Sequence, residues 1–212
     1  MRGLLIAFEG LDQSGKQTQA ELLRDRLTAA GRTVRLLSFP DYETVIGAEI
    51  GRALRGERDY GSDVMQLLYV ANRYEWKKEI VRAKDAGEIL VCDRYLASSV
   101  AYGEAQGLDS AWLLDIQKYL PQPDLTVLLD IPPDVSARRK TTDRDKYERD
   151  LALLARVRDS YLRQAASAEA TAARAASAWV RINADRDRDD VGADVYAAVV
   201  RAMSGSAAAD RA

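Results

Sequence analysis

A glycine-rich loop that ends in a lysine is the segment of the sequence with the clearest chemistry. Gly10, Gly15 and Lys16 have the spacing Gly-x-x-x-x-Gly-Lys, and the loop lies between an apolar run and a helical pattern. The glycines let backbone N–H groups converge on phosphate oxygens, while the lysine reaches the outer phosphates. This spacing predicts an ATP site. Its candidate residues are Gly10, Leu11, Asp12, Gln13, Ser14, Gly15, Lys16, Gln17 and Thr18.

Two further features of the loop concern metal binding. In loops of this type the residue after the lysine is usually Ser or Thr, whose hydroxyl contacts Mg²⁺, but here it is Gln17. A carboxamide oxygen can ligate a hard cation, so Gln17 either holds the metal with a different reach or leaves it to other residues. Asp12 could hold Mg²⁺ or orient an attacking phosphate oxygen; alternatively, it only favours the helix dipole. We expect Mg²⁺ as a cofactor because it neutralises charge on a transferring phosphate.

Polar and aromatic side chains follow the second and third apolar runs of the chain. Arg94 comes directly after Asp93, and an arginine beside a phosphate loop is well placed to hold a phosphate bidentately. The alternative is a structural ion pair between Asp93 and Arg94, and both interpretations can hold together. The other candidates at these strand ends are Phe39, Pro40, Tyr42, Ser98, Ser99 and Tyr102.

Tyr69 and Arg73 form a second candidate pair, one helical turn apart. The tyrosine ring could stack on a flat ligand while the arginine reads a base edge or a phosphate. Without the phosphate loop, such a pair is usually a half-buried surface feature.

Residues 138–149 form a basic segment. It holds six basic residues against three acids, in a polar stretch that includes two threonines. A basic flap that closes over phosphates and excludes water fits phosphoryl transfer; otherwise, a run of charges is usually a solvated face. The basic residues are Arg138, Arg139, Lys140, Arg144, Lys146 and Arg149.

Short apolar runs alternate with helical patterns along the chain. This alternation predicts an α/β fold with a parallel sheet covered on both faces, whose ligands bind at the carboxyl ends of the strands. We expect one domain over residues 1–203 and a disordered tail over 204–212. The expected strands are 4–8, 33–39, 88–92, 125–131 and 179–183, and the expected helices are 16–30, 65–76, 97–106, 111–119, a long one from about 147, and 190–203.

Composition excludes several classes of function. The chain of 212 residues has no histidine, which rules out Ser-His and Cys-His mechanisms and histidine-ligated metals. Its net charge of −2 gives no global attraction for nucleic acid or an anionic membrane. No apolar stretch approaches the roughly 20 residues that span a bilayer. The single cysteine, Cys92, cannot form an internal disulfide, so we expect a cytoplasmic protein.

Several motifs together resemble the thymidylate kinases, which pass the γ-phosphoryl group of ATP to dTMP. The resemblance extends to about residue 203 and implies a P-loop NTPase fold: a three-layer α/β/α sandwich with a five-stranded parallel sheet and a LID over about 138–149. The Asp-Arg-Tyr and Asn-Arg segments are the most specific. The matching segments are Phe8-Glu9-Gly10-Leu11-Asp12, Gly15-Lys16, Phe39-Pro40, Ala71-Asn72-Arg73, Asp93-Arg94-Tyr95 with Ser98, Ala101 and Tyr102, Leu120-Pro121-x-Pro123-Asp124, and Tyr147-Glu148-Arg149.

The resemblance implies a role for each matching residue. Lys16 would hold the β- and γ-phosphates of ATP, together with the loop backbone and Arg138. Asp12 would lie near the acceptor phosphate and Mg²⁺, and Arg94 would bridge the transferring phosphoryl group and the dTMP phosphate. Glu148 would lie near the acceptor sugar or its metal. The family also implies a homodimer.

The resemblance also implies how the thymine and sugar are held. Tyr69 is placed to stack on thymine, and the guanidinium of Arg73 to bond its carbonyl edge. Ser99 would contact the base, while Tyr102 would press on the sugar at C2′ and disfavour a ribose. The implied dTMP-binding set is Asp12, Phe39, Pro40, Tyr42, Tyr69, Arg73, Arg94, Ser98, Ser99, Tyr102 and Glu148.

The chain departs from some family members at two loop positions. Gln13 stands where some members have an arginine, and members without it supply that cation from the flap. Arg144 is therefore the candidate for the catalytic cation. Gln17 resembles members in which acceptor-side carboxylates hold the metal, which makes Asp12 and Glu148 the principal candidate ligands.

These residues predict an in-line attack by a dTMP phosphate oxygen on the γ-phosphorus of ATP. Positioning and charge neutralisation would supply most of the catalysis, because the acceptor is already ionised. Two alternatives remain. One is a related kinase that acts on another nucleoside monophosphate or on a nucleoside, in which case Glu9 could be the base that deprotonates a sugar hydroxyl. The other is a nucleotide-binding regulator with impaired turnover, which only Gln17 favours.

Overall fold

A parallel β-sheet is the centre of the fold. The computed structural model describes residues 3–139, 150–171 and 178–209. Within these residues five strands are hydrogen-bonded in the order β2-β3-β1-β4-β5, and every neighbouring pair is parallel. The strands are β1 Leu4–Glu9, β2 Val34–Ser38, β3 Ile89–Asp93, β4 Leu125–Asp130 and β5 Ala178–Asn183.

The register of the central strands places the loops that carry the candidate site residues at one edge of the sheet. All six residues of β1 are buried, as expected for a strand covered on both faces. Phe8 near the end of β1 lies beside Asp93 at the end of β3, and Glu9 lies beside Leu128 of β4. The segments after β1 and β3 therefore leave the sheet side by side.

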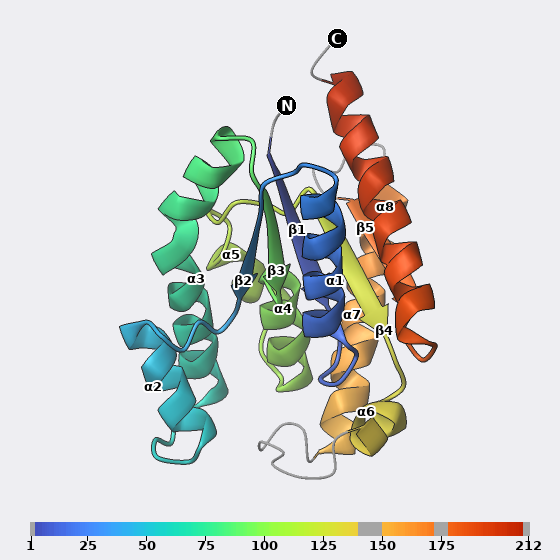
Figure 1. Cartoon of the computed structure of the whole chain (residues 1–212). Helices are drawn as coiled ribbons and strands as arrows, with labels where there is room; N and C mark the ends of the chain where they lie inside the picture. Colours follow the sequence, from blue (N-terminus) through green and yellow to red (C-terminus); the bar gives the residue numbers. More distant parts are fainter. Residues whose placement is uncertain (1–2, 140–149, 172–177, 210–212) are drawn as a thin grey trace.

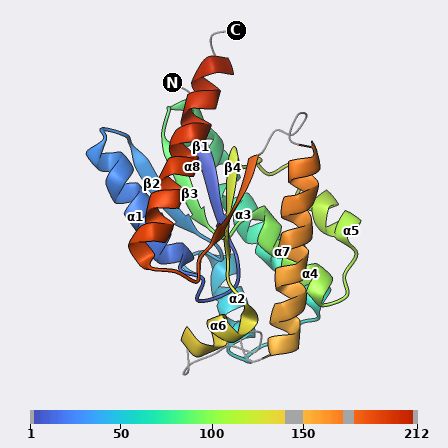
Figure 2. The same cartoon turned by 90° about the vertical axis from the view of Figure 1, so that its right-hand side faces the viewer.

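Two layers of helices cover the sheet (Figures 1 and 2). Helices α1 and α8 pack against each other on one face, while α3, α4 and α7 lie on the opposite face. Helix α2 packs on α3, α5 on α4 and α6 on α7. The result is a three-layer α/β/α sandwich. The helix bounds are α1 Lys16–Ala29, α2 Val45–Leu54, α3 Ser62–Asp85, α4 Leu96–Ala105, α5 Ser110–Asp115, α6 Pro133–Arg139, α7 Leu151–Thr171 and α8 Arg188–Ala209.

The five expected strands are confirmed, each within one residue at either end. Helix α2 was not expected, because two glycines inside it lower its intrinsic helix propensity. Its first turn is capped by Thr44, whose hydroxyl accepts a hydrogen bond from the backbone N–H of Gly47 at 3.0 Å. The expected helix over 111–119 is also shorter, since α5 ends at Asp115.

The end of the chain differs from the expected disordered tail. Helix α8 continues to Ala209, so residues 204–209 are helical. This segment ends in a run of alanine, the residue with the highest helix propensity. No helix in the described ranges combines the length and the apolar character of a membrane span.

Candidate active site

The loop after β1 has the backbone that a phosphate cradle requires. Gly10 has φ 137°, and a Cβ atom there would lie 2.4 Å from the carbonyl oxygen of Leu129, so only glycine fits. Gly15, with φ 91°, is the N-cap residue of α1. The helix N-terminus therefore opens into the loop, where unpaired backbone N–H groups and the helix dipole favour an anion.

Lys16 lies inside this cradle and is 6% exposed. Its Nζ donates a hydrogen bond to the carbonyl oxygen of Leu11 at 2.8 Å. Burial, followed by the positive charge of Arg94, lowers the pKa of Lys16 below its ordinary value. The negative charge of a polyphosphate would offset both effects and favour the charged form of the lysine.

Two pockets meet at Asp12 and Arg94. The first surrounds the phosphate loop and includes Lys16 among its lining residues. The second extends between the loop after β2 and helices α3 and α4. The pockets also share Phe39, Pro40 and Tyr42, so Asp12 and Arg94 are the charged residues among those common to both. The first pocket is lined by Asp12, Gln13, Gly15, Lys16, Gln17, Thr18, Ser38, Phe39, Pro40, Tyr42, Asp93 and Arg94. The second is lined by Asp12, Phe39, Pro40, Tyr42, Leu54, Gln66, Tyr69, Arg73, Arg94, Ser98, Ser99, Tyr102 and Gln106.

Arg94 is held by its backbone and by its side chain. Its φ is 63°, in the left-handed region that non-glycine residues rarely adopt, and its N–H donates to the carbonyl oxygen of Phe8 at 2.9 Å. Its guanidinium donates to Oδ1 of Asp12 at 2.6 Å and to the hydroxyls of Ser98 and Tyr102, each at 3.3 Å. The sequence alternative of an ion pair with Asp93 is wrong, because the ion-pair partner of Arg94 among the described residues is Asp12.

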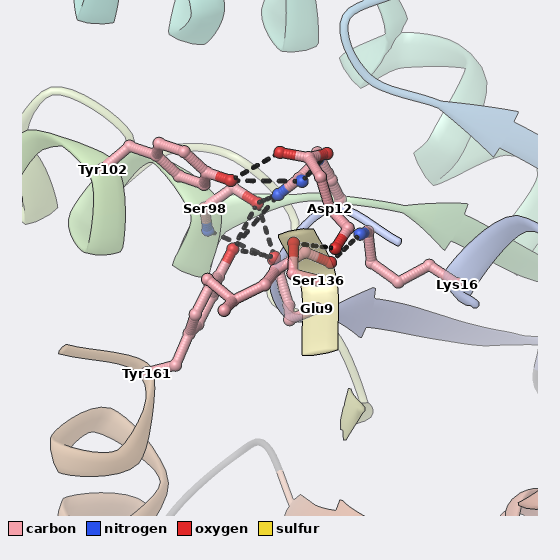
Figure 3. A network of polar contacts seen from close by, with 9 residues as sticks. Glu9, Asp12, Lys16, Ser98, Tyr102, Ser136 and Tyr161 are labelled. Carbon is pink, nitrogen blue, oxygen red and sulfur yellow. Dashed lines mark hydrogen bonds and ion pairs between the residues drawn. The ribbon is translucent and has the colours of Figure 1, made fainter. Parts of the chain in front are cut away.

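Asp12 has both carboxylate oxygens engaged. Oδ1 accepts from Arg94, and Oδ2 accepts from the Tyr102 hydroxyl at 3.0 Å (Figure 3). Burial alone would raise the pKa of Asp12, but the charges of Arg94 and Lys16 outweigh it and lower the pKa to about 2. The carboxylate is therefore ionised at any physiological pH.

Glu9 lies beneath this pair and is fully buried. It accepts hydrogen bonds from the backbone N–H of Tyr95 at 2.9 Å and from the Ser98 hydroxyl at 2.6 Å. The hydroxyl of Tyr161, from α7, lies 2.9 Å from Ser98 Oγ and donates to Glu9 at 3.2 Å (Figure 3). Because its oxygens are engaged and water cannot reach it, Glu9 is a structural anchor for the loop after β3.

The end of the second pocket away from the phosphate loop contains an arginine without a carboxylate partner among the described residues. Arg73 is 3% exposed and donates from Nη1 to the Ser99 hydroxyl at 2.8 Å and to the carbonyl oxygen of Tyr69 at 3.3 Å. Its Nε is buried without a hydrogen-bond partner, and none of the ion pairs among the described residues includes it. Burial lowers the pKa of Arg73, the effect of a charge in a site without a close counterion.

Helix α6 joins the base of the expected LID to the phosphate loop. Ser136 donates to the carbonyl oxygen of Asp12 at 2.8 Å (Figure 3), and Arg139 to that of Gln13 at 3.1 Å. Arg139 also reaches the carbonyl oxygen of Ala184 after β5, at 3.0 Å. Arg138, in contrast, is exposed and pairs with Asp134.

Some predicted residues cannot be placed. Arg144 and Glu148 lie outside the described residues, as do Lys140, Lys146 and Arg149. Gln17 is exposed and donates to Glu21 at 3.1 Å. The described part of the chain contains no cluster of three acidic or cysteine side chains that could hold a metal by itself. It does contain Asp93, whose Oδ1 is buried without a hydrogen-bond partner in the wall of the phosphate-loop pocket.

Sequence reasoning missed functional candidates that lacked a motif. Asp93 was considered only as a partner of Arg94 and as part of the Asp-Arg-Tyr segment, and Arg139 only as one of the basic residues of the flap. Tyr161, Ser136 and Gln66 enter the site through packing between segments far apart in the chain. No local pattern distinguishes these three residues.

Comparisons with known proteins agree with this geometry. The family model described as thymidylate kinase matches residues 8–184. A thymidylate kinase of Caenorhabditis elegans is 34% identical over 205 residues, covering 92% of this chain and 89% of that protein. One of Plasmodium falciparum is 32% identical over 201 residues, covering 94% and 91%. The solved thymidylate kinase of Candida albicans aligns with a TM-score of 0.81 at 29% identity, over 94% of this chain and 92% of that one.

Proposed function

The chain belongs to the thymidylate kinase family and phosphorylates dTMP with ATP, and we propose that its two joined pockets divide donor from acceptor. The observation that supports this division is their common wall. Asp12 and Arg94 line both pockets, with an ion pair of 2.6 Å between them. These are the only charged residues that line both pockets among the described residues, so a phosphoryl group that passes between the pockets would be neutralised by Arg94.

The donor side is the phosphate loop. Its backbone N–H groups and Lys16 would hold the β- and γ-phosphates of ATP, because both direct positive charge at one cavity. The assigned loop residues Leu11, Gln13, Ser14 and Thr18 would contribute mainly through their backbone. This binding fixes the γ-phosphorus at the border between the pockets.

The acceptor side places the dTMP phosphate beside Arg94 and the thymine between Tyr69 and Arg73. The phosphate oxygen would attack in line, and it needs no strong base because it is already ionised near neutral pH. Arg94 would neutralise charge on the transferring group, while Asp12 and Tyr102 hold its guanidinium in place. Phe39, Pro40, Tyr42, Ser98 and Ser99 complete the acceptor pocket.

The donor set at the border suits Mg²⁺, which binds oxygen ligands through one or two carboxylates plus substrate phosphates. Asp93 offers an unpaired carboxylate oxygen in the phosphate-loop pocket, and Asp12, Gln17 and Glu148 are further candidates. When bound, the ion would neutralise charge on the phosphates. Asp93 is the strongest of these candidates, because both oxygens of Asp12 already accept hydrogen bonds.

The LID would supply the remaining cations. We assign the catalytic cation to Arg144 and contacts with ATP to Arg138. Arg139 is a further candidate for the ATP side, since it spans from the phosphate loop to the loop after β5. In this proposal, a movement of the LID would change the position of the phosphate loop, because α6 is hydrogen-bonded to that loop.

A coupled assay of ADP release tests the proposal with dTMP, dUMP, AMP, CMP and thymidine as acceptors. We expect the highest kcat/KM with dTMP and none above background with thymidine, because Glu9 is not available as a base. Preference for thymidine would indicate a nucleoside kinase, and preference for AMP or CMP another nucleoside monophosphate kinase. Activity with none of the acceptors would favour a nucleotide-binding regulator.

We propose further that the protein is a cytoplasmic homodimer. Cys92 is buried in β3 and unpaired, which suits a reducing compartment. The outer face of α3 exposes Leu67 and Val81, apolar side chains of the kind that a dimer buries. Sedimentation at micromolar concentration tests the dimer, and a single species of about 23.5 kDa would overturn it.

A further inference from the structure

A buried carboxamide in the acceptor pocket lacks a hydrogen-bond partner. Gln66, on α3, is 1% exposed, and its Oε1 is buried without a partner among the described residues. The same side chain lines the second pocket, where the sequence analysis did not place it. An amide oxygen in this state costs about 1–3 kcal/mol relative to a satisfied one.

The position of Gln66 indicates which part of a ligand it meets. Residues 66, 69 and 73 lie three and four positions apart, so Gln66 shares one face of α3 with Tyr69 and Arg73. Leu54, from α2, lines the same end of the pocket. In the proposed function this end receives the base, whereas the phosphate lies beside Arg94.

Two unpaired polar atoms therefore occur at the base end. Gln66 Oε1 is a hydrogen-bond acceptor, and Arg73 Nε is a donor, and both are buried without partners. Thymine presents a complementary edge, because its ring N–H lies between two carbonyl groups. An acceptor and a donor on one helix face match such an imide, whereas cytosine carries a bare ring nitrogen in place of the N–H.

We propose that Gln66 is a specificity-determining residue whose carbonyl accepts a hydrogen bond from the imide N–H of the base. This inference rests on the proposed function. The bond satisfies an atom that is unsatisfied in the free enzyme. A base without this N–H leaves the carbonyl facing a lone pair, so cytosine is rejected. Uracil has the same imide as thymine, so Gln66 does not distinguish dTMP from dUMP.

The substitution Gln66→Met tests this role, because it keeps the length of the side chain and removes the amide. We expect kcat/KM for dTMP and for dUMP to fall together by about 5- to 30-fold, the loss of one buried hydrogen bond. The value for dCMP stays equal or rises, because the carbonyl that faced the cytosine lone pair has been removed, so the dTMP-to-dCMP ratio falls. The thermal midpoint of the free enzyme stays equal or rises, because an unsatisfied polar group has been removed.

Gln117→Met is the matched control. Gln117 is 2% exposed and also has an unpaired Oε1, but it lies outside the acceptor pocket. This variant should leave the dTMP-to-dCMP ratio unchanged. Should Gln66→Met fail to fold, Gln66→Leu provides the same comparison.

The outcomes separate this inference from the proposed function. An unchanged dTMP-to-dCMP ratio in Gln66→Met, with a lower thermal midpoint, would overturn the inference and make Gln66 a packing residue. A fall for dTMP without an equal fall for dUMP would overturn it as well. A wild-type enzyme inactive with dTMP would instead overturn the proposed function.

Discussion

The two ends of the acceptor pocket each contain an arginine, partly buried at the phosphate end and fully buried at the base end, and the two have different surroundings. At the phosphate end, Arg94 donates to Asp12, Ser98 and Tyr102, and the tyrosine hydroxyl donates in turn to Asp12. At the base end, Arg73 has no carboxylate partner among the described residues and keeps an unpaired Nε. The polar groups at the phosphate end are paired in the free protein, whereas in the proposed function those at the base end would be paired by the ligand.

The pKa shifts have the same contrast. Burial opposes the charge of Arg94, but Asp12, Tyr102, Tyr161 and Asp93 together outweigh it and raise the pKa. The pKa of Arg73 is lowered by burial, which the distant acid Glu9 offsets only in part. A preorganised charge suits catalysis, because it requires no reorganisation during phosphoryl transfer. An uncompensated polar site suits recognition, because a wrong ligand leaves it unpaired.

The largest expected effect comes from breaking the phosphate end. Arg94→Ala should lower the single-turnover rate of phosphoryl transfer by a factor of about 100 or more, through lost electrostatic stabilisation. Arg82→Ala is the control, since Arg82 is an exposed arginine paired with Glu79 and away from the site. A rate for Arg94→Ala within a few-fold of wild type would remove this residue from the mechanism.

Asp12→Asn breaks the same end more gently. The amide keeps the shape of the side chain but removes the charge that fixes the Arg94 guanidinium, so kcat should fall by about 10-fold or more. Steady-state kinetics with saturating ATP and dTMP measure this fall. A normal kcat would mean that the hydroxyls that accept from Arg94 are enough to position it, namely those of Ser98, Tyr102 and, at 3.4 Å, Tyr161.

The contacts from α6 should have smaller effects. Ser136→Ala removes the hydrogen bond to the Asp12 carbonyl oxygen, and we expect KM for ATP to rise by about three- to tenfold, the value of one hydrogen bond. The stability of the fold should change little. An unchanged KM for ATP together with a raised KM for dTMP would mean that Ser136 acts on the acceptor side.

A fourth prediction concerns the stability of the fold against pH rather than the rate. Because the folded-state pKa of Asp12 is lowered to about 2, its ionised form stabilises the fold above the ordinary carboxyl pKa near 4. This contribution, on the order of 2 kcal/mol, is lost as the pH falls from about 4 towards 2 and is constant above pH 5. In urea unfolding between pH 6 and 2, the difference in unfolding free energy between wild type and Asp12→Asn should therefore narrow below pH 4 and close as the pH approaches 2. Parallel curves over the whole range would contradict the lowered pKa.

The sequence predicted the residues at the phosphate end of the acceptor pocket better than those at the base end. The strands were recognised because apolar runs and glycines determine them locally, and the Gly-Lys loop and Arg94 follow such strands directly. Helix α2 was missed, since it depends on packing against α3 more than on its own glycine-containing sequence. Gln66 was missed because it stands out only by a buried oxygen without a hydrogen-bond partner, and packing of distant segments determines that property.

Arg73→Met tests most directly the contrast between the paired Arg94 and the unpaired Arg73. The dissociation constant for dTMP and the unfolding free energy of the free enzyme are measured on the same preparation of the variant. We predict that the dissociation constant rises by about 10-fold or more, while the unfolding free energy stays equal or increases, because a buried charge without a counterion has been removed. A variant that loses more than about 2 kcal/mol of stability but binds dTMP normally would contradict the account, since Arg73 would then be satisfied by the protein itself.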